Sequence, residues 1–359
     1  MTDDRHSPER GTTAADPLKG PTPAPAGAPT GEEQLLSVRD LTVRYRTDSG
    51  FVTAVDRLSF DLAPGETLGI VGESGSGKSA ASLAMMGLLP RTAEVTGSVR
   101  LRGRELLGLS DGRMREIRGR RIAVIFQDAL SALNPMMTVG AQLMEAVQVH
   151  DPNRTGRAMR ERAVELLDLV GIPSPQERLD QYPHEFSGGM RQRALIAMGI
   201  ANDPDILIAD EPTTALDVTV QAQVLDVIER VQDRTGTAVV LITHDLGVVA
   251  GLADQVMVMY AGTKLEEAPV EPLFYEPAHP YTRGLLAALP RVDRRAGRLL
   301  PIPGQPPQAH DRPAGCPFEP RCSYAEPAAC SVPVQAVTEV TPGHTTACVR
   351  IHQIASVIR

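Results

Sequence analysis

The sequence predicts an α/β protein built around a glycine-rich loop that joins a buried strand to a helix. The loop, GESGSGKS at Gly72–Ser79, follows the apolar run Thr67–Val71 and precedes the Ala/Leu/Met-rich segment Ala80–Leu89. The apolar run is typical of a buried strand, and the segment after the loop is typical of a helix that stops at Pro90. Further apolar runs end on polar residues, as parallel strands do when they bring side chains to one edge of a sheet; they are Ile122–Phe126, Ile206–Ala209 and Val239–Thr243.

The composition agrees with this class and limits the function. The chain has 359 residues, enough for two domains, and carries a net charge of −8 with no Trp and only 3% aromatic residues. Few aromatics and a negative charge disfavour nucleic acid as a partner, whereas a nucleotide is bound by local groups. No apolar run approaches the ~20 residues that span a bilayer. Residues 1–33 are polar and rich in Pro and Gly, so we expect a disordered tail rather than a signal peptide, and a cytoplasmic protein.

Two apolar–polar segments before the loop are expected to form antiparallel strands. They read SVRDLTVRY and VTAVDRLSFDL and are separated by Asp48–Gly50. Tyr45 or Phe51 could stack on an adenine ring, but either could equally be a half-buried aromatic of a strand. The segments predict a β subdomain beside the loop.

The loop has the spacing G-x-x-x-x-G-K-S of a phosphate-binding P-loop. Its glycines let the backbone turn N–H groups toward phosphate oxygens, and the following helix N-terminus adds positive potential. Lys78 would meet the β- and γ-phosphates, and Ser79 would ligate Mg²⁺. The residues expected to hold the nucleotide are Gly72, Glu73, Ser74, Gly75, Ser76, Gly77, Lys78, Ser79 and Ala80.

Polar residues at the ends of the apolar runs are candidates for catalysis. Gln127 follows the first run and could contact Mg²⁺ or water, and Asp210 and Glu211 follow the second. Asp210 is expected to hold Mg²⁺, and Glu211 to accept a proton from an attacking water. His244 follows the third run and could contact a γ-phosphate. Each residue alone would be an ordinary loop side chain; together behind a P-loop they predict a phosphate-hydrolysing site.

A helical subdomain is expected at about 128–204. Residues 141–149 and 157–170 have apolar positions at helical spacing, and a longer helix is predicted over Met190–Ala201. Ser187, Gly188 and Gly189 precede that helix, so hydroxyl and N–H groups form a second anion site. Elsewhere, hairpins are expected to turn at Arg102–Gly103 and Ala261–Gly262, and a helix is expected from Val218.

The last part of the chain, 271–359, is Pro-rich and contains all four cysteines. It opens with a predicted helix at Tyr281–Leu289. In a reducing compartment, clustered cysteines favour metal or cluster binding over disulfides. The four are Cys316, Cys322, Cys330 and Cys348.

The motifs, in this order, resemble the ATP-binding subunits of ABC transporters over about residues 35–269. GESGSGKS is similar to Walker A, Gln127 to the Q-loop, FSGGMRQR to the signature motif, ILIADE to Walker B, Asp217 to the D-loop residue and His244 to the switch histidine. The resemblance implies ATP and Mg²⁺ as cofactors and ATP hydrolysis as the activity. It also implies that Ser187, Gly188 and Gly189 clamp the γ-phosphate of ATP bound by a partner ATPase, and that Asp217 belongs to the nucleotide-binding residues. Phe186 and Met190 depart from the commoner LSGGQ signature, but the serine and both glycines are kept.

The C-terminal segment narrows the resemblance. HPYTRGLLAALP, PIPGQPP and CPFEPRC are similar to the extension of oligopeptide and dipeptide importer ATPases, in particular the D-type subunit. Members with this cysteine pattern are associated with a [4Fe–4S] cluster, for which the spacing C-x5-C-x7-C-x17-C supplies four thiolates. A four-cysteine zinc site or buried inert thiols remain alternatives.

The resemblance therefore predicts an ATPase subunit, at 34–270, that energises peptide import from the cytoplasmic face of the membrane. The implied partners are two permease subunits, a second ATPase of the related F-type and, indirectly, an extracytoplasmic solute-binding protein. The segment from Asn134 to Val139 lies where such ATPases dock a permease helix. Import of nickel or another solute, or a role outside transport, are the alternatives.

Overall fold

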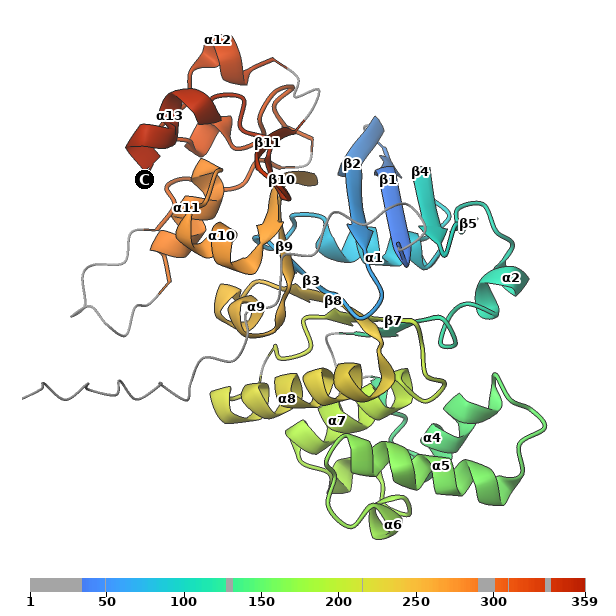
Figure 1. Ribbon diagram of the computed structural model, residues 1–359. Coiled ribbons are helices and arrows are strands. Elements are labelled where there is room, and N and C mark those ends of the chain that lie inside the picture. Colours follow the sequence, from blue (N-terminus) through green and yellow to red (C-terminus); the bar gives the residue numbers. More distant parts are fainter. Residues whose placement is uncertain are drawn as a thin grey trace, which may run out of the picture.

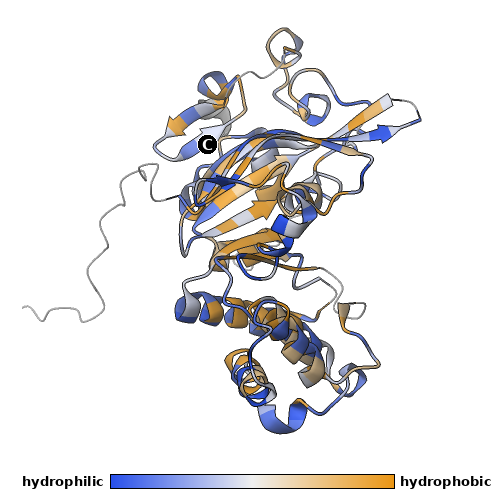
Figure 2. Ribbon diagram, turned by 90° about the vertical axis from the view of Figure 1, so that its right-hand side faces the viewer, coloured by the Kyte–Doolittle hydropathy of each residue, from blue (hydrophilic) through white to orange (hydrophobic). Residues whose placement is uncertain are grey.

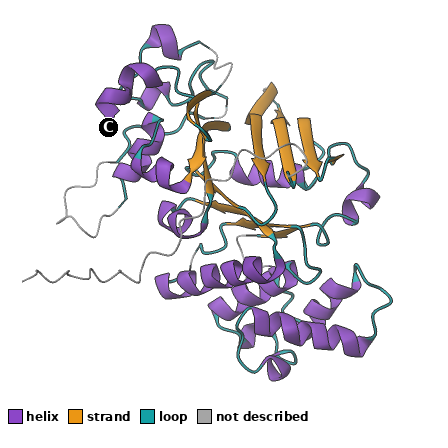
Figure 3. Ribbon diagram, viewed as in Figure 1, coloured by secondary structure: helices purple, strands orange, loops and turns teal. Residues whose placement is uncertain are grey.

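The chain folds into two β-sheets with a helix between them and a group of helices on the other face of the larger sheet (Figure 1). This computed structural model describes residues 34–48, 50–126, 132–214, 216–289, 301–308, 310–332 and 337–358. Figure 3 shows the strands gathered between a group of helices and the C-terminal segment. The expectation for residues 1–33 lies outside the described residues.

The smaller sheet is antiparallel and has the strand order β2-β1-β4-β5. Its strands are β1 (Leu36–Thr47), β2 (Gly50–Leu62), β4 (Ala93–Leu101) and β5 (Arg104–Glu105). The predicted hairpin turns at Arg102 and Gly103, which both have positive φ, 48° and 77°, as a tight turn between strands requires. The predicted antiparallel β subdomain is thus confirmed.

The larger sheet has the order β11-β12-β10-β9-β3-β8-β7-β6. Its parallel strands are β3 (Thr67–Val71), β6 (Ile122–Ile125), β7 (Ile206–Asp210), β8 (Ala238–Thr243) and β9 (Gln255–Tyr260). Strands β3, β7 and β8 are buried at every position, as expected for parallel strands covered on both faces. Their carboxyl ends therefore lie at one edge, where the candidate polar residues follow.

Helix α1 (Lys78–Met85) lies between the two sheets, and a helical layer covers the other face of the larger sheet (Figure 1). The predicted helices at 141–149 and 157–170 are α4 (Val139–Gln148) and α5 (Gly156–Leu169). Apolar residues of this layer face the strands, and hydrophilic residues face outward (Figure 2). The layer also contains α6 (Pro175–Arg178), the 3₁₀ turn η1 (Pro183–Glu185), α7 (Gly188–Gly199) and α8 (Val218–Thr235).

Helix α7 begins at Gly188, two residues before its predicted start. The Oγ of Ser187 accepts a hydrogen bond from the N–H of Met190 at 3.3 Å, so Ser187 is the N-cap. The first N–H groups of a helix have no backbone acceptor, and the serine oxygen accepts the hydrogen bond of one of them. Both glycines therefore belong to the first turn of the helix.

The C-terminal segment continues the larger sheet. After β9, strand β10 (Thr263–Pro269) pairs with β12 (His344–Thr346), which pairs with β11 (Thr338–Thr341). The helix predicted at 281–289 is α11 (Pro280–Ala287). The remaining elements are α2 (Asp111–Arg115), α9 (Leu246–Leu252), α10 (Val270–Tyr275), the 3₁₀ turn η2 (Glu319–Arg321), α12 (Pro327–Cys330) and α13 (Ile351–Ile358).

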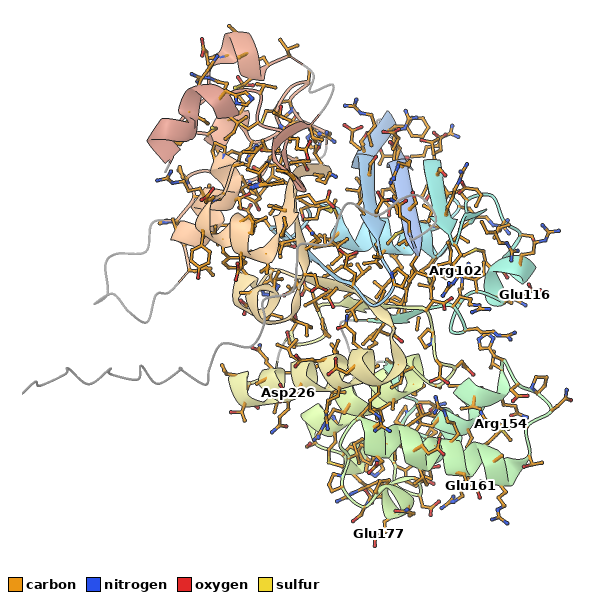
Figure 4. All side chains as sticks on the ribbon, in the orientation of Figure 1. Arg102, Glu116, Arg154, Glu161, Glu177 and Asp226 are labelled. Carbon is orange, nitrogen blue, oxygen red and sulfur yellow. The ribbon has the colours of Figure 1, made fainter. Side chains whose placement is uncertain are left out.

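Charged side chains cover the outside of the molecule. Figure 4 shows Glu116, Arg154 and Glu177 at its outer edge. Among the described residues, no helix combines the length and the apolar character needed to cross a bilayer.

Candidate nucleotide site

The loop Gly72–Ser79 leaves the carboxyl end of β3 and runs into α1 (Figure 1). A Cβ atom at Gly77 would lie 2.4 Å from the carbonyl oxygen of Ala54, and one at Gly72 would lie 2.1 Å from that of Met259. Gly77 also has a φ of 97°, in the region that favours glycine. The backbone therefore requires glycine at both ends of the loop.

Lys78 is held across the loop by three acceptors. Its Nζ donates to the carbonyl oxygens of Gly72 at 2.7 Å and Glu73 at 3.1 Å, and to the Oγ of Ser76 at 3.2 Å. Burial lowers the pKa of the Lys78 ammonium, and the carboxylates of Glu211, Asp210 and Glu73 oppose that shift. The arrangement places a buried positive charge inside the glycine loop.

Asp210, the last residue of β7, lies beside the start of α1. Burial raises the pKa of its carboxyl, a hydrogen bond from Ser79 lowers it, and the charge of Glu211 raises it further. A hydroxyl and a carboxylate side by side are ligand types that Mg²⁺ uses at phosphate sites, where substrate and water complete the shell. Ser79 and Asp210 thus supply protein ligands suited to this ion.

Glu211 and His244 follow neighbouring strands and approach each other. The Oε1 of Glu211 lies 3.4 Å from the Nδ1 of His244, and its Oε2 accepts a hydrogen bond from the Oγ1 of Thr214 at 2.8 Å. Glu211 has a φ of +50°, uncommon for a residue with a side chain. Its N–H donates to the carbonyl oxygen of Ile242 in β8 at 2.8 Å, which fixes this conformation.

Most of the phosphate loop, with Glu211 and His244, lines one cavity of about 660 Å³, a size suited to a nucleotide-sized ligand; Gly72, Glu73 and Asp210 are not among its lining residues. The structure brings together Ala54, Ser74, Gly75, Ser76, Gly77, Lys78, Ser79, Ala80, Glu211 and His244. Of the two aromatics proposed to stack on adenine, Tyr45 packs against the apolar core, whereas Phe51 is half exposed beside Arg44. Neither belongs to this lining, although Ala54 of the same hairpin does. The assignment of Tyr45 remains a prediction.

The second predicted anion site lies apart from this cavity, in the helical layer. Ser187, Gly188 and Gly189 open α7, and Asp217 caps α8 by accepting from the N–H of Val220 at 3.0 Å. A Cβ at Gly189 would lie 2.7 Å from the side chain of Val220, so the crossing of the two helices requires a glycine there. None of these four predicted residues lines the cavity. Gln127 lies outside the described residues.

The four cysteines come together in the C-terminal segment. Cys316, Cys322, Cys330 and Cys348 are free thiols that line one small cavity with His279. Burial raises the pKa of Cys316 to about 12 and that of Cys348 to about 11. In the part of the chain that the structure describes, no group of three or more His, Cys, Asp or Glu side chains is arranged to hold a metal ion. Four thiols are the ligands that an iron–sulfur cluster needs, but in this structure the four cysteines are not arranged to hold a metal ion.

Three side chains at the site were not predicted from the sequence. Thr214 holds Glu211, while Tyr281 and Arg321 contact Glu73 of the loop. Tyr281 opens the helix predicted at 281–289, and Arg321 lies between Cys316 and Cys322 in CPFEPRC, but neither was predicted to contact the loop. Because Arg321 is 248 positions away from Glu73 in the chain, no local pattern could have joined them.

Comparison with known proteins agrees with this geometry. Residues 55–214 match the ABC transporter family, and residues 265–330 match the C-terminal region of oligopeptide/dipeptide transporters. The oligopeptide transport ATP-binding protein OppD of Escherichia coli is 48% identical over 90% of this chain and 96% of its own. A putative peptide import ATP-binding protein of Brucella abortus is 50% identical over 88% of this chain and 94% of its own.

Two further matches extend the comparison. OppD of Mycobacterium tuberculosis is 55% identical over 88% of this chain, which spans only 52% of that longer relative. An ATP-binding cassette dimer, solved in a post-hydrolysis state with ADP and Pi, superposes with a TM-score of 0.58 at 25% identity, over 66% of this chain and 98% of its own. The chain therefore belongs to the family of ATP-binding proteins of oligopeptide and dipeptide ABC transporters.

Proposed function

We propose that the chain hydrolyses ATP to drive the import of di- or oligopeptides across the cytoplasmic membrane. The observation that carries this is that a phosphate loop, Glu211 and His244 line the same cavity. The names of the relatives, oligopeptide transport and peptide import ATP-binding proteins, favour a peptide over nickel as the solute. A role outside transport gains no support from these relatives.

In this mechanism the protein positions phosphates and stabilises charge. Lys78 and the loop N–H groups bind the β- and γ-phosphates. Ser79 and Asp210 would hold Mg²⁺, which would supply positive charge beside the phosphates. Glu211 takes the proton from the attacking water, while Thr214 orients its carboxylate. His244 lies beside Glu211 in the same cavity, and there it would contact the γ-phosphate.

The second anion site then acts on another ATPase. Ser187 and Gly188 are exposed away from the chain's own cavity, with the buried Gly189 directly behind them, so this helix start would face ATP held by a partner subunit. The related F-type chain is the proposed partner. Two permease subunits would anchor the pair at the cytoplasmic face of the membrane, and an extracytoplasmic solute-binding protein would deliver the peptide.

The base assignment is tested with Glu211→Gln. This variant keeps the shape of the side chain but cannot accept the proton, so MgATP should still bind while turnover falls by about a hundredfold or more. Equilibrium binding of ATP and release of phosphate from the assembled transporter measure the two effects. Hydrolysis at the wild-type rate would show that Glu211 is not the base.

We further propose that the four cysteines hold a [4Fe–4S] cluster. Their convergence on one cavity supports this, and the cluster would require their sulfurs to move to ligating distances. Protein purified without oxygen should then absorb broadly near about 400 nm and contain about four irons per chain. Colourless protein without iron would leave four buried thiols and no cluster.

A further inference from the structure

An ion pair joins the C-terminal segment 271–359, called the C-terminal extension below, directly to the phosphate loop. The Nη1 of Arg321 donates to both carboxylate oxygens of Glu73, at 3.1 and 2.9 Å. Only 6% of the Arg321 side chain and 26% of that of Glu73 are exposed. A contact this shielded from water depends on both partners, because removing one would leave the other charge buried and unpaired.

Arg321 is itself held rigidly from the extension. Its Nε donates to the carbonyl oxygen of Pro303 at 2.9 Å, and its Nη1 also donates to the Oη of Tyr260 at 3.1 Å. The guanidinium lies 5.7 Å from the ring centre of Tyr260 and 6.0 Å from that of Phe318. Because these contacts leave the Arg321 side chain few other conformations, Arg321 holds the carboxylate of Glu73 in one position.

Glu73 contacts both Arg321 and Lys78, the residue expected to bind the phosphates. Its carbonyl oxygen accepts from the Nζ of Lys78 at 3.1 Å and from the N–H of Ser76 at 3.1 Å. Its own N–H donates to the Oη of Tyr281, in α11, at 3.1 Å. The side chain and the N–H of Glu73 are thus both held by the extension, while its carbonyl holds the inside of the loop.

We propose that Arg321 is a positioning residue of the nucleotide site: through Glu73 it fixes the phosphate loop, so that the C-terminal extension sets the affinity for ATP. This inference rests on the proposed function, since it assumes that the loop binds ATP. Arg321 touches no phosphate; it acts by keeping the Glu73 carbonyl and Lys78 in place. Small displacements at such sites are costly, because binding depends on groups that are already aligned.

A second ion pair between extension and core provides a matched control. The Nη2 of Arg312 donates to Asp56 and to Thr263, each at 2.7 Å, and its side chain is 16% exposed. Neither partner belongs to the loop 72–79. Arg312→Met therefore removes a comparable contact without touching the support of Glu73.

The test compares Arg321→Met, Arg321→Lys and Arg312→Met in the assembled transporter. We expect Arg321→Met to raise the KM for ATP about tenfold, as loss of a charge-assisted contact would, and to change kcat by less than about threefold. Arg321→Lys, which keeps the charge, should recover part of the affinity. Arg312→Met should leave the KM for ATP unchanged. It controls for stability, because both methionine variants lose an ion pair and can lower the melting temperature by the same amount. Equal KM values in the two methionine variants, at a temperature where both are folded, would overturn the proposal.

A double-mutant cycle adds a readout that does not depend on turnover. Glu73→Gln removes the charge that Arg321 neutralises, so combining it with Arg321→Met should weaken binding of MgADP by less than the product of the two single effects. Independent effects would mean that Arg321 acts on something other than Glu73. Failure of the proposed function looks different: the wild-type transporter itself would then neither bind ATP nor release phosphate.

Discussion

At the scale of single residues, unusual backbone conformations decide where the site's groups point. Glu211 has a positive φ that its N–H bond to Ile242 maintains, and this turns its carboxylate toward His244 and Thr214. Strained conformations of this kind persist only where surrounding contacts fix them. The loop glycines show the same dependence, because neighbouring carbonyl groups occupy the space that a side chain would need.

Gly77→Ala should weaken ATP binding by at least about tenfold, because the new Cβ would meet the carbonyl oxygen of Ala54 at 2.4 Å and push the loop away from Lys78's acceptors. Gly75→Ala is the control: its φ of 76° is also positive, but no atom lies within 4 Å of the added Cβ. Titration with a fluorescent ATP analogue compares the two. Similar losses in both variants would show that backbone conformation, and not the close contact, explains the need for glycine.

At the scale of elements, apolar runs that end on polar residues predicted the parallel strands and the edge where they deliver side chains. The runs at β3, β7 and β8 are buried throughout, and hydrophobicity alone predicted their boundaries to within one residue. The division into two sheets could not be predicted, because strand pairing depends on contacts between distant segments. For the same reason β12, only three residues long, gave no sign that it would pair with β10.

The turn into β3 contains a carboxylate in an unfavourable position. Burial raises the pKa of Glu66; a hydrogen bond from the N–H of Ala63 opposes this, and the charges of Asp254, Glu267 and Asp61 add to it. The folded state therefore disfavours the ionised form present at pH 7. This loss of stability is fully present above the raised pKa of Glu66 in the folded protein. It diminishes as the pH falls through that pKa.

Glu66→Gln should raise the free energy of unfolding at pH 7 by about 0.5 kcal/mol, a small value because water partly screens this side chain. The amide oxygen can still accept from the N–H of Ala63, whereas Glu66→Ala loses that acceptor and should destabilise the protein. Urea unfolding at pH 7 and at acidic pH measures the difference, which should shrink at acidic pH. A gain that is independent of pH would contradict this explanation.

At the scale of the whole molecule, an exposed apolar residue lies in the segment from Asn134 to Val139, which is predicted to dock a permease helix. Met136 is 83% exposed. The buried Gln142 anchors the loop that contains Met136. Its side-chain amide donates hydrogen bonds to the carbonyl oxygens of Asn134 at 3.0 Å and Met137 at 3.1 Å. A rigid loop presenting a flexible apolar side chain suits docking of a helix from a membrane partner.

Met136→Glu should reduce recovery of the permease subunits with the purified chain by about tenfold, since a charge would enter an apolar contact. Binding of MgATP to the isolated chain should not change. Val149→Glu, at another exposed position of the helical layer, serves as the control. Equal recovery of permease with both variants would place the docking surface elsewhere.

The pairing of β12 with β10 also has a consequence for solubility. If the extension were absent, β10 would present its unpaired N–H and C=O groups to solvent on one side of the larger sheet. Such an open strand is a template for association with other chains. Because β12 pairs with Glu266 and Glu267 and β11 pairs with β12, the edge of the sheet becomes the four-residue strand β11, and a short edge strand is a poor template for association.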